Sequence, residues 1–168
     1  MKKQQIFFEE NQRFTQWWIW AITVGAASVS IYANIQTIEL GGSLLNWTNF
    51  SLIIPILIIP TLFYFLLLKT RVEEKGIYVR FIPFHWKEIF FAWEQLESCR
   101  VRTYSPIGEY GGWGIKYGLG GAGKVYNVRG NQGLQLVFKD GSRLLIGTQK
   151  PQELQEILNK LDLFPSRK

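Results

Sequence analysis

The feature that most constrains this chain is the stretch from Phe14 to Leu68, in which Glu39 is the only charged residue. Two apolar segments lie within it, at 16–35 and 47–68. Each has about the twenty residues that a helix needs to cross roughly 30 Å of hydrocarbon. A chain of 168 residues has too small a core to bury both in a soluble domain. We therefore expect a transmembrane hairpin of two helices.

Aromatic residues mark the ends of these segments, with Trp17, Trp18 and Trp20 at the start of the first and Trp47 at the start of the second. Such residues favour membrane–water interfaces. A cleaved signal peptide is the main alternative for the first segment. The acidic pair Glu9-Glu10 ahead of it and the length of the apolar run argue against that alternative.

Positive charges predict the orientation of the hairpin. The connecting loop, 36–46, has no lysine or arginine, whereas both flanking regions do. The positive-inside rule then places both termini and everything after residue 68 in the cytoplasm, in an inner-membrane protein. The flanking charges are Lys2, Lys3 and Arg13 on one side and Lys69, Arg71 and Lys75 on the other.

The expected organisation is thus a cytoplasmic segment at 1–15, the hairpin, and a cytoplasmic domain at 69–168. This domain has sixteen basic and ten acidic residues and so holds the net charge of +6 of the whole chain. A basic domain tethered to an anionic leaflet is attracted to it by roughly 1 kcal/mol per nearby lysine or arginine. A solvated basic surface is the plain alternative.

Period-two alternation and turn residues predict seven or eight strands in this domain. A turn at Lys75-Gly76 and a two-residue hairpin at Asp140-Gly141 are the clearest connections. The expected strands are 70–74, 77–82, 85–91, 98–104, 113–117, 124–129, 134–138 and 143–146.

A helix is expected after the last strand. Pro151 suits its first position, and Leu154, Ile157, Leu158 and Leu161 form one apolar stripe. The fold class is therefore α+β: a transmembrane hairpin followed by an antiparallel β-barrel or strongly curved sheet that an amphipathic helix caps.

The stretches TRVEEKGIYVRFIPFHWKEIFFAWEQLESCRVRTY and KDGSRLLIGTQKPQELQEIL resemble the opening and close of bacterial pleckstrin-homology-like (PH-like) domains. Those domains are seven-stranded barrels with a C-terminal helix, often placed after two membrane helices. The resemblance covers about residues 69–162 and implies a binding or assembly module without catalysis. The basic signature of the lipid-binding pleckstrin domains is incomplete here, so the resemblance assigns no headgroup site.

A glycine-rich run, GLGGAG at 118–123, fits the G-x-G-x-x-G pattern of dinucleotide-binding turns. That interpretation needs a helix after the last glycine. Residues 124–129 instead read as a strand, so we expect no nucleotide and no cofactor. We expect turns at Gly118, Gly123 and Gly130, and a mobile contact loop at 109–112 and 120–121.

Catalytic and metal-binding patterns are absent from the sequence. The one histidine and one cysteine, His85 and Cys99, cannot form a common zinc site and lack a third group to orient a nucleophile–base pair. Cys99 fits a small core residue. We expect a protein that is not an enzyme.

Basic and aromatic residues that interleave on the predicted strands suggest a contact surface. Such a surface suits single-stranded nucleic acid, but membrane tethering argues against it. A protein partner, a second copy of the chain, or the lipid bilayer suits it better. We therefore expect an interaction, scaffold or accessory subunit, or alternatively a lipid- or small-ligand-binding domain. The candidate residues are Lys75, Arg80, Arg100, Arg102, Tyr104, Tyr110, Trp113, Lys116, Lys124 and Arg129.

Overall fold

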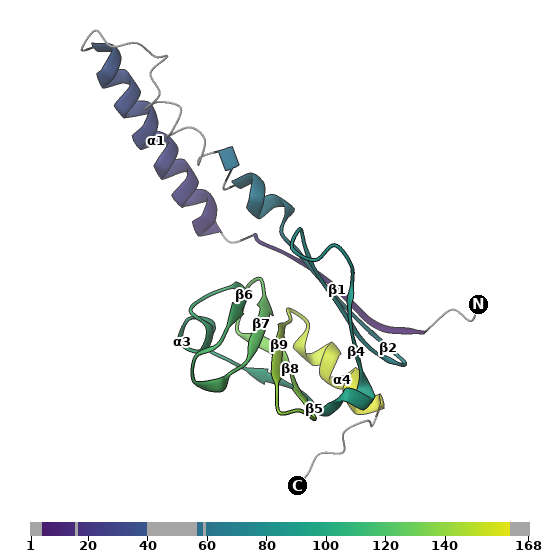
Figure 1. Ribbon diagram of the computed structural model, residues 1–168. Helices are drawn as coiled ribbons and strands as arrows, with labels where there is room; N and C mark the ends of the chain where they lie inside the picture. The colour runs from purple at the N-terminus through teal and green to yellow at the C-terminus, as the bar shows by residue number, and fades with distance from the viewer. Residues whose placement is uncertain (1–4, 16, 40–56, 59, 162–168) are drawn as a thin grey trace. The chain divides into compact units, whose positions relative to one another are not determined.

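The computed structural model describes residues 5–15, 17–39, 57–58 and 60–161. They belong to a mixed α+β protein (Figure 1) with two compact units. An apolar unit spans residues 14–66, and a β unit combines residues 1–13 with 67–168. The β unit is therefore built from both sides of the apolar stretch.

The apolar unit contains the long helix α1, Trp17–Glu39. Its 23 residues span about 34 Å at 1.5 Å per residue. In the part of the chain that the structure describes, α1 is the one helix long and apolar enough to cross a membrane. Most of its side chains are exposed within the unit, an exposure that costs free energy in water.

Two boundaries of the predicted hairpin change. The first segment was expected to end at residue 35, but α1 continues to Glu39, so the predicted loop 36–46 begins four residues too early. Half of the second segment, 47–68, lies outside the described residues. Residues 57–58 and 60–65 are helical, and the last two residues of the segment, 67–68, are part of a strand.

Sheet A of the β unit has four antiparallel strands in the order β1-β2-β3-β4. They are β1 (Ile6–Arg13), β2 (Leu67–Glu73), β3 (Gly76–Ile82) and β4 (Ile89–Ala92). β2 and β3 form the predicted hairpin, but its turn residues are Glu74 and Lys75 rather than Lys75 and Gly76, because Gly76 already pairs with Glu73. The predicted strand 85–91 is wrong at its start, because β4 begins only at Ile89.

The strand β1 was not expected. It pairs with β2 along its length, with Arg13 opposite Leu67 and Glu10 opposite Thr70. Its inward side chains, Phe8, Glu10 and Gln12, are buried. Residues 6–13 are therefore a structural part of the β unit rather than a separate segment.

Sheet B has five strands in the order β5-β8-β9-β7-β6. β7 and β9 are parallel, so the expectation of a wholly antiparallel sheet is wrong at this pair. Among the described residues the strands form two separate sheets rather than one closed barrel. The strands are β5 (Leu96–Thr103), β6 (Gly114–Tyr117), β7 (Lys124–Asn127), β8 (Gln132–Phe138) and β9 (Arg143–Gly147).

The turn between β8 and β9 has three residues, not the two predicted. The Gly141 amide donates to the Phe138 carbonyl (2.9 Å), and the Phe138 amide donates to the Ser142 carbonyl (2.9 Å). Gly141 has a positive φ of 81°. This is the pattern of a turn closed by a left-handed residue.

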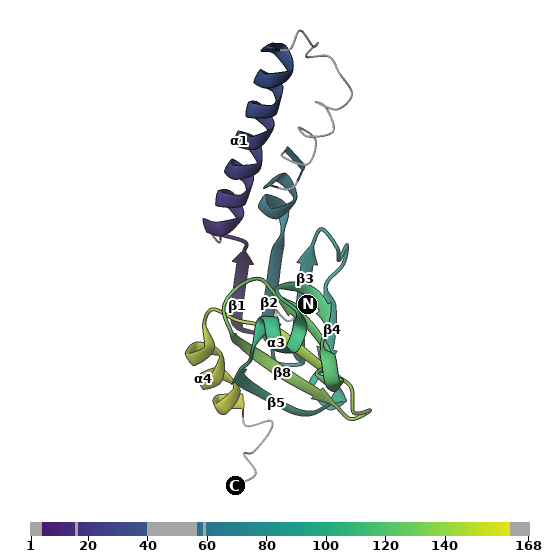
Figure 2. The same ribbon diagram turned by 90° about the vertical axis from the view of Figure 1, so that its left-hand side faces the viewer.

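The described residues of the unit also form three short helical turns and one longer helix. The turns are η1 (Trp93–Gln95), α3 (Pro106–Tyr110) and η2 (Leu119–Gly121). The predicted helix is α4, Pro151–Leu161, with Leu154 buried. It contacts β1, β5 and β8, and so joins the two sheets (Figure 2).

Candidate functional site

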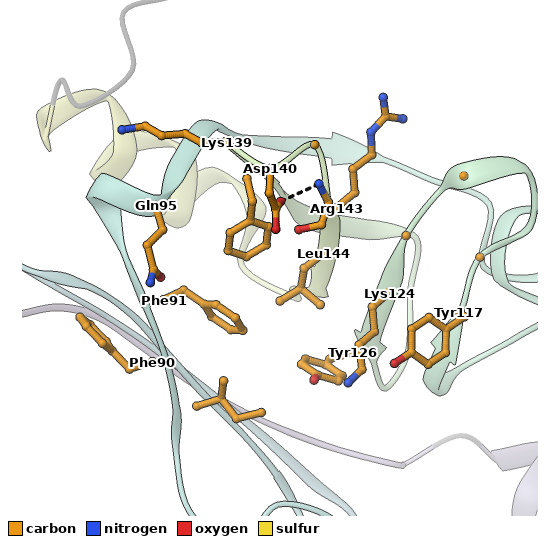
Figure 3. A pocket seen from close by; sticks show the side chains of 17 residues that line it. Phe90, Phe91, Gln95, Tyr117, Lys124, Tyr126, Lys139, Asp140, Arg143 and Leu144 are labelled. Carbon is orange, nitrogen blue, oxygen red and sulfur yellow. Dashed lines mark hydrogen bonds between the residues drawn. The ribbon is translucent and has the colours of Figure 1, made fainter.

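A broad open groove lies between sheet A and the connections of sheet B (Figure 3). Its volume is about 1050 Å³, large enough for a small molecule or for several residues of a partner chain. We call it the aromatic groove. It is lined by residues of β4 and η1 on one side, the β6–β7 connection on another, and the β8–β9 turn on the third: Ile89, Phe90, Phe91, Gln95, Tyr117, Gly118, Gly121, Gly123, Lys124, Tyr126, Phe138, Lys139, Asp140, Gly141, Ser142, Arg143 and Leu144.

Aromatic rings from both sheets meet in and below this groove. Phe91 of β4 contacts Phe138 of β8, with ring centroids 5.6 Å apart. His85, in the connection before β4, contacts Tyr126 of β7 at 5.1 Å. Tyr117 remains 76% exposed at the edge. These rings give the groove an apolar floor and an exposed aromatic rim.

Lys124 is the cation placed closest to these rings. Its Nζ lies 4.9 Å from the Tyr126 ring centroid and 5.6 Å from that of Tyr117. Interaction with the Tyr126 hydroxyl raises the pKa of Lys124, so the ammonium stays charged. Burial and this ammonium lower the pKa of His85. The groove therefore offers one fixed positive charge among aromatic faces.

Further charges stand on the rim. Lys139, Asp140 and Arg143 come from the β8–β9 turn and its flanks, and in Figure 3 the side chains of Lys139 and Arg143 extend away from the groove floor. Asp140 accepts a hydrogen bond from the Ser142 amide (2.8 Å). Interaction with the Ser142 hydroxyl, and then with this amide, lowers the pKa of Asp140. With Lys124, the lining carries three basic side chains and one acidic side chain.

The glycine run forms one wall of the groove. It connects β6 to β7, and the Gly118 amide donates to the Gly123 carbonyl (2.7 Å). A strand follows the last glycine, as the sequence predicted, so the helix required of a dinucleotide turn does not follow it. At Gly123 the backbone has φ of 82°, and a Cβ would overlap the Arg143 carbonyl oxygen. Close strand approach explains this glycine.

Three residues predicted as contact surface have structural roles instead. Arg102 forms an ion pair with Glu109 (2.7 Å), which raises the pKa of Arg102 and lowers that of Glu109. Tyr104 and Tyr110 are buried, and burial raises the pKa of both. The Tyr110 hydroxyl donates to the Ala122 carbonyl (3.2 Å). The cluster therefore contacts the glycine run through the Tyr110 hydroxyl.

The expected loop at 109–112 is wrong at its start, because Glu109 and Tyr110 belong to the short helix α3. Ser105 caps the short helix α3 by accepting from the Gly108 amide (3.1 Å), and the left-handed Gly111 ends it. Glu109 is bound to Arg102 from within this helix. Gly120 and Gly121, by contrast, are exposed and have open space around them.

The other predicted surface residues are spread over the β unit, and only Lys124 lines the groove. Lys75 is exposed in the turn between β2 and β3, and Arg100 is exposed on β5. Two further side chains bind backbone carbonyls: Arg80 binds that of His85 (3.3 Å) and Lys116 that of Gly111 (2.7 Å). Trp113 donates to the Gly130 carbonyl (3.1 Å). Arg129 is exposed in the connection after β7.

The two residues considered for catalysis do not form a site. Cys99 is buried in β5, where burial raises the pKa of its thiol. The Nδ1 atom of His85 accepts from the Phe81 amide (3.1 Å). Within the described ranges, no group of three or more histidine, cysteine, aspartate or glutamate side chains could hold a metal ion.

Sequence reasoning missed most of the groove, including Phe90, Phe91 and Phe138. Each lay in or beside a predicted strand, but alternation does not say which strands meet. Comparison with models of known protein families gives no match, and comparison with curated proteins gives none either.

Proposed function

We propose that this chain is a membrane-anchored, non-enzymatic binding module of the PH-like kind, whose aromatic groove receives a segment of a partner protein. The groove is the observation that carries the proposal. It is open, aromatic and basic, and the described residues contain no group of histidine, cysteine and carboxylate side chains that could hold a metal ion.

Pairing of β1 with β2 supports the anchor. If α1 crosses a membrane, Arg13 and Leu67 must still lie on the same side, because they are opposite each other in one sheet. The chain then has to cross a second time between Glu39 and Leu67. The apolar sequence of 47–66 is suited to this second crossing.

The same pairing disfavours removal of α1 as a signal peptide. Cleavage after α1 would separate β1 from the sheet in which its Phe8, Glu10 and Gln12 are buried. Lysine and arginine on both flanks and none in the 36–46 region favour an inner-membrane protein with a cytoplasmic β unit.

The charge of the groove favours an acidic partner. Lys124 lies between two aromatic rings, and Lys139 and Arg143 stand on the rim around a single aspartate. A segment with a carboxylate and neighbouring aromatic or aliphatic side chains would pair with the ammonium and cover the rings. Attraction at the rim would speed its approach.

An amphiphile with an anionic head is the second candidate. The volume of about 1050 Å³ matches sites for small molecules, and the net charge of +6 favours anionic lipid. The open form of the groove favours an extended chain over an enclosed ligand, so we rank the lipid second.

A photo-crosslinking residue at position 117 tests this proposal. Tyr117 is exposed at the groove, and p-benzoylphenylalanine preserves its ring. Irradiation of native membranes should give one discrete protein adduct. Lys124→Gln should lower its yield at least about tenfold, because a lost charge-assisted contact is worth roughly 1.5–3 kcal/mol. Lys124→Arg should largely retain it.

The matched control is the same photoreactive residue at Ile107, which is 69% exposed and lies outside the groove. A lipid adduct at 117 would favour the second candidate. Equal adducts at 117 and 107, or a yield at 117 that Lys124→Gln does not change, would contradict the groove as a binding site.

A further inference from the structure

The connection between β3 and β4, residues 83–88, lies at one defined end of sheet A. Register places Ile82, the last residue of β3, opposite Leu67, the first residue of β2. Leu67 is in turn opposite Arg13, the last residue of β1. The 83–88 connection therefore leaves the sheet at the end where the chain passes into and out of the apolar unit.

Chain length limits how far this end can be from the proposed membrane helices. Four residue steps separate Arg13 from Trp17, the first residue of α1, and they span at most about 14 Å. On the other side, Leu67 directly follows Leu66 of the apolar unit. An anchored chain thus holds the 83–88 connection within reach of the membrane surface.

The side chains of this connection suit that surface. Trp86 is 90% exposed and Phe84 57% exposed, and Lys87 beside them is exposed as well. Exposure of these rings to water does not stabilise the protein. At headgroup depth the apolar ring and the polar indole N–H of tryptophan are both satisfied, and a lysine is attracted to anionic lipid.

Contacts with the sheet hold the connection in place. The His85 amide donates to the Phe81 carbonyl (2.8 Å), and the His85 Nδ1 accepts from the Phe81 amide (3.1 Å). With its ring against Tyr126, His85 is fixed toward the β unit. At the far end, Glu88 pairs with Arg71 (2.9 Å). The exposure of Phe84 and Trp86 thus belongs to a fixed loop.

We propose that the 83–88 connection is a third membrane contact, in which Trp86 and Phe84 enter the interfacial layer of the cytoplasmic leaflet beside the two crossings. It would fix the tilt of the β unit against the bilayer. This inference depends on the proposed anchor, but it adds a surface that the anchor alone does not require.

Spin labels on the full chain in vesicles of phosphatidylcholine and phosphatidylglycerol test it. Labels are placed at Lys87→Cys in the connection, at Ile107→Cys elsewhere on the β unit, and at Val24→Cys in α1. Buried Cys99 is left in place. Collision with lipid-soluble oxygen is compared with collision with a water-soluble nickel chelate. The expected oxygen-to-nickel ratio at 87 is severalfold above that at 107, and it falls to the value at 107 when Trp86→Ser is added.

The label at Val24 separates the two proposals. Lipid exposure at 24 with a fully aqueous label at 87 overturns the membrane contact and leaves the anchor standing. An aqueous label at 24 overturns both. A label at 87 that neither reagent reaches indicates cover by protein, and it also overturns the inference.

Discussion

Replacing Gly123 with alanine is expected to destabilise the β unit by more than about 3 kcal/mol. Gly123 has a φ of 82°, and an added Cβ would overlap the Arg143 carbonyl oxygen and lie 2.6 Å from the Arg143 Cβ. The left-handed backbone alone costs an alanine roughly 1–2 kcal/mol. Moving the backbone of β9 away would add to this and would disturb the β7–β9 pairing.

Gly121→Ala is the matched control for this prediction. Gly121 has the same φ of 82°, but nothing lies within 4 Å of an added Cβ, so it should cost only about 1–2 kcal/mol. Denaturant unfolding of the full chain in detergent, followed by far-ultraviolet circular dichroism, measures both. Equal losses of unfolding free energy in the two variants would contradict the close approach of the Arg143 backbone to Gly123.

Glu10→Ala is expected to cost about 2–4 kcal/mol, although the residue lies outside the predicted domain. Its carboxylate accepts from the Thr148 hydroxyl (2.7 Å) and from the Gln149 amide (2.7 Å), just before α4. Alanine would leave both donors unpaired in a buried place, and each such loss costs roughly 1–3 kcal/mol. The same unfolding measurement applies.

Two variants isolate this effect. Glu10→Gln keeps an acceptor and should stay within about 1 kcal/mol of the parent chain. Glu9→Ala removes a neighbouring exposed carboxylate and should change little. A Glu9→Ala loss as large as that of Glu10→Ala would contradict the inward placement of Glu10.

Stability should also depend on pH through this group. Burial raises the pKa of Glu10 above its ordinary value of 4.5, so the folded state binds the proton more tightly than the unfolded state does. The contribution is fully present below pH 4.5 and is lost as the pH rises through the raised pKa. Glu10→Gln should remove this dependence.

Local signals in the sequence predicted much of sheet B and α4. Asp140-Gly141 predicted the β8–β9 turn, although as a turn of two residues instead of three. Pro151 predicted the start of α4. These features depend on neighbouring residues, and turn chemistry and apolar periodicity report on neighbours.

The strand β1 could not be predicted in this way. Its second half reads Glu9-Glu10-Asn11-Gln12, a run of residues that strands usually avoid. Glu10 and Gln12 are buried because they bind Thr148 and Gly147, about 135 positions away. No feature of the neighbouring sequence indicates these distant partners.

The groove was hidden for the same reason. The groove depends on the parallel pairing of β7 with β9, two strands that β8 separates in the sequence but not in the sheet. This pairing brings Gly123 against Arg143. Arg102 and Tyr110 were predicted to be surface residues because the type of an amino acid does not indicate how exposed its side chain is. Ser105-Pro106 ahead of Glu109 was an available helix-start signal for α3, the helix that contains Tyr110 and the ion-pair partner of Arg102.

Sided cysteine labelling tests the central claim, a hairpin anchor with one β unit on its cytoplasmic side, most directly. Cysteines at Asn11, Ser43 and Ile107 are each treated in intact cells with a membrane-impermeant maleimide, then again after permeabilisation; the parent chain, with only buried Cys99, is the background. We expect labelling from outside at 43 alone, with 11 and 107 labelled only after permeabilisation. Labelling of 11 and 107 from opposite sides, or of 43 from the same side as 107, would contradict it.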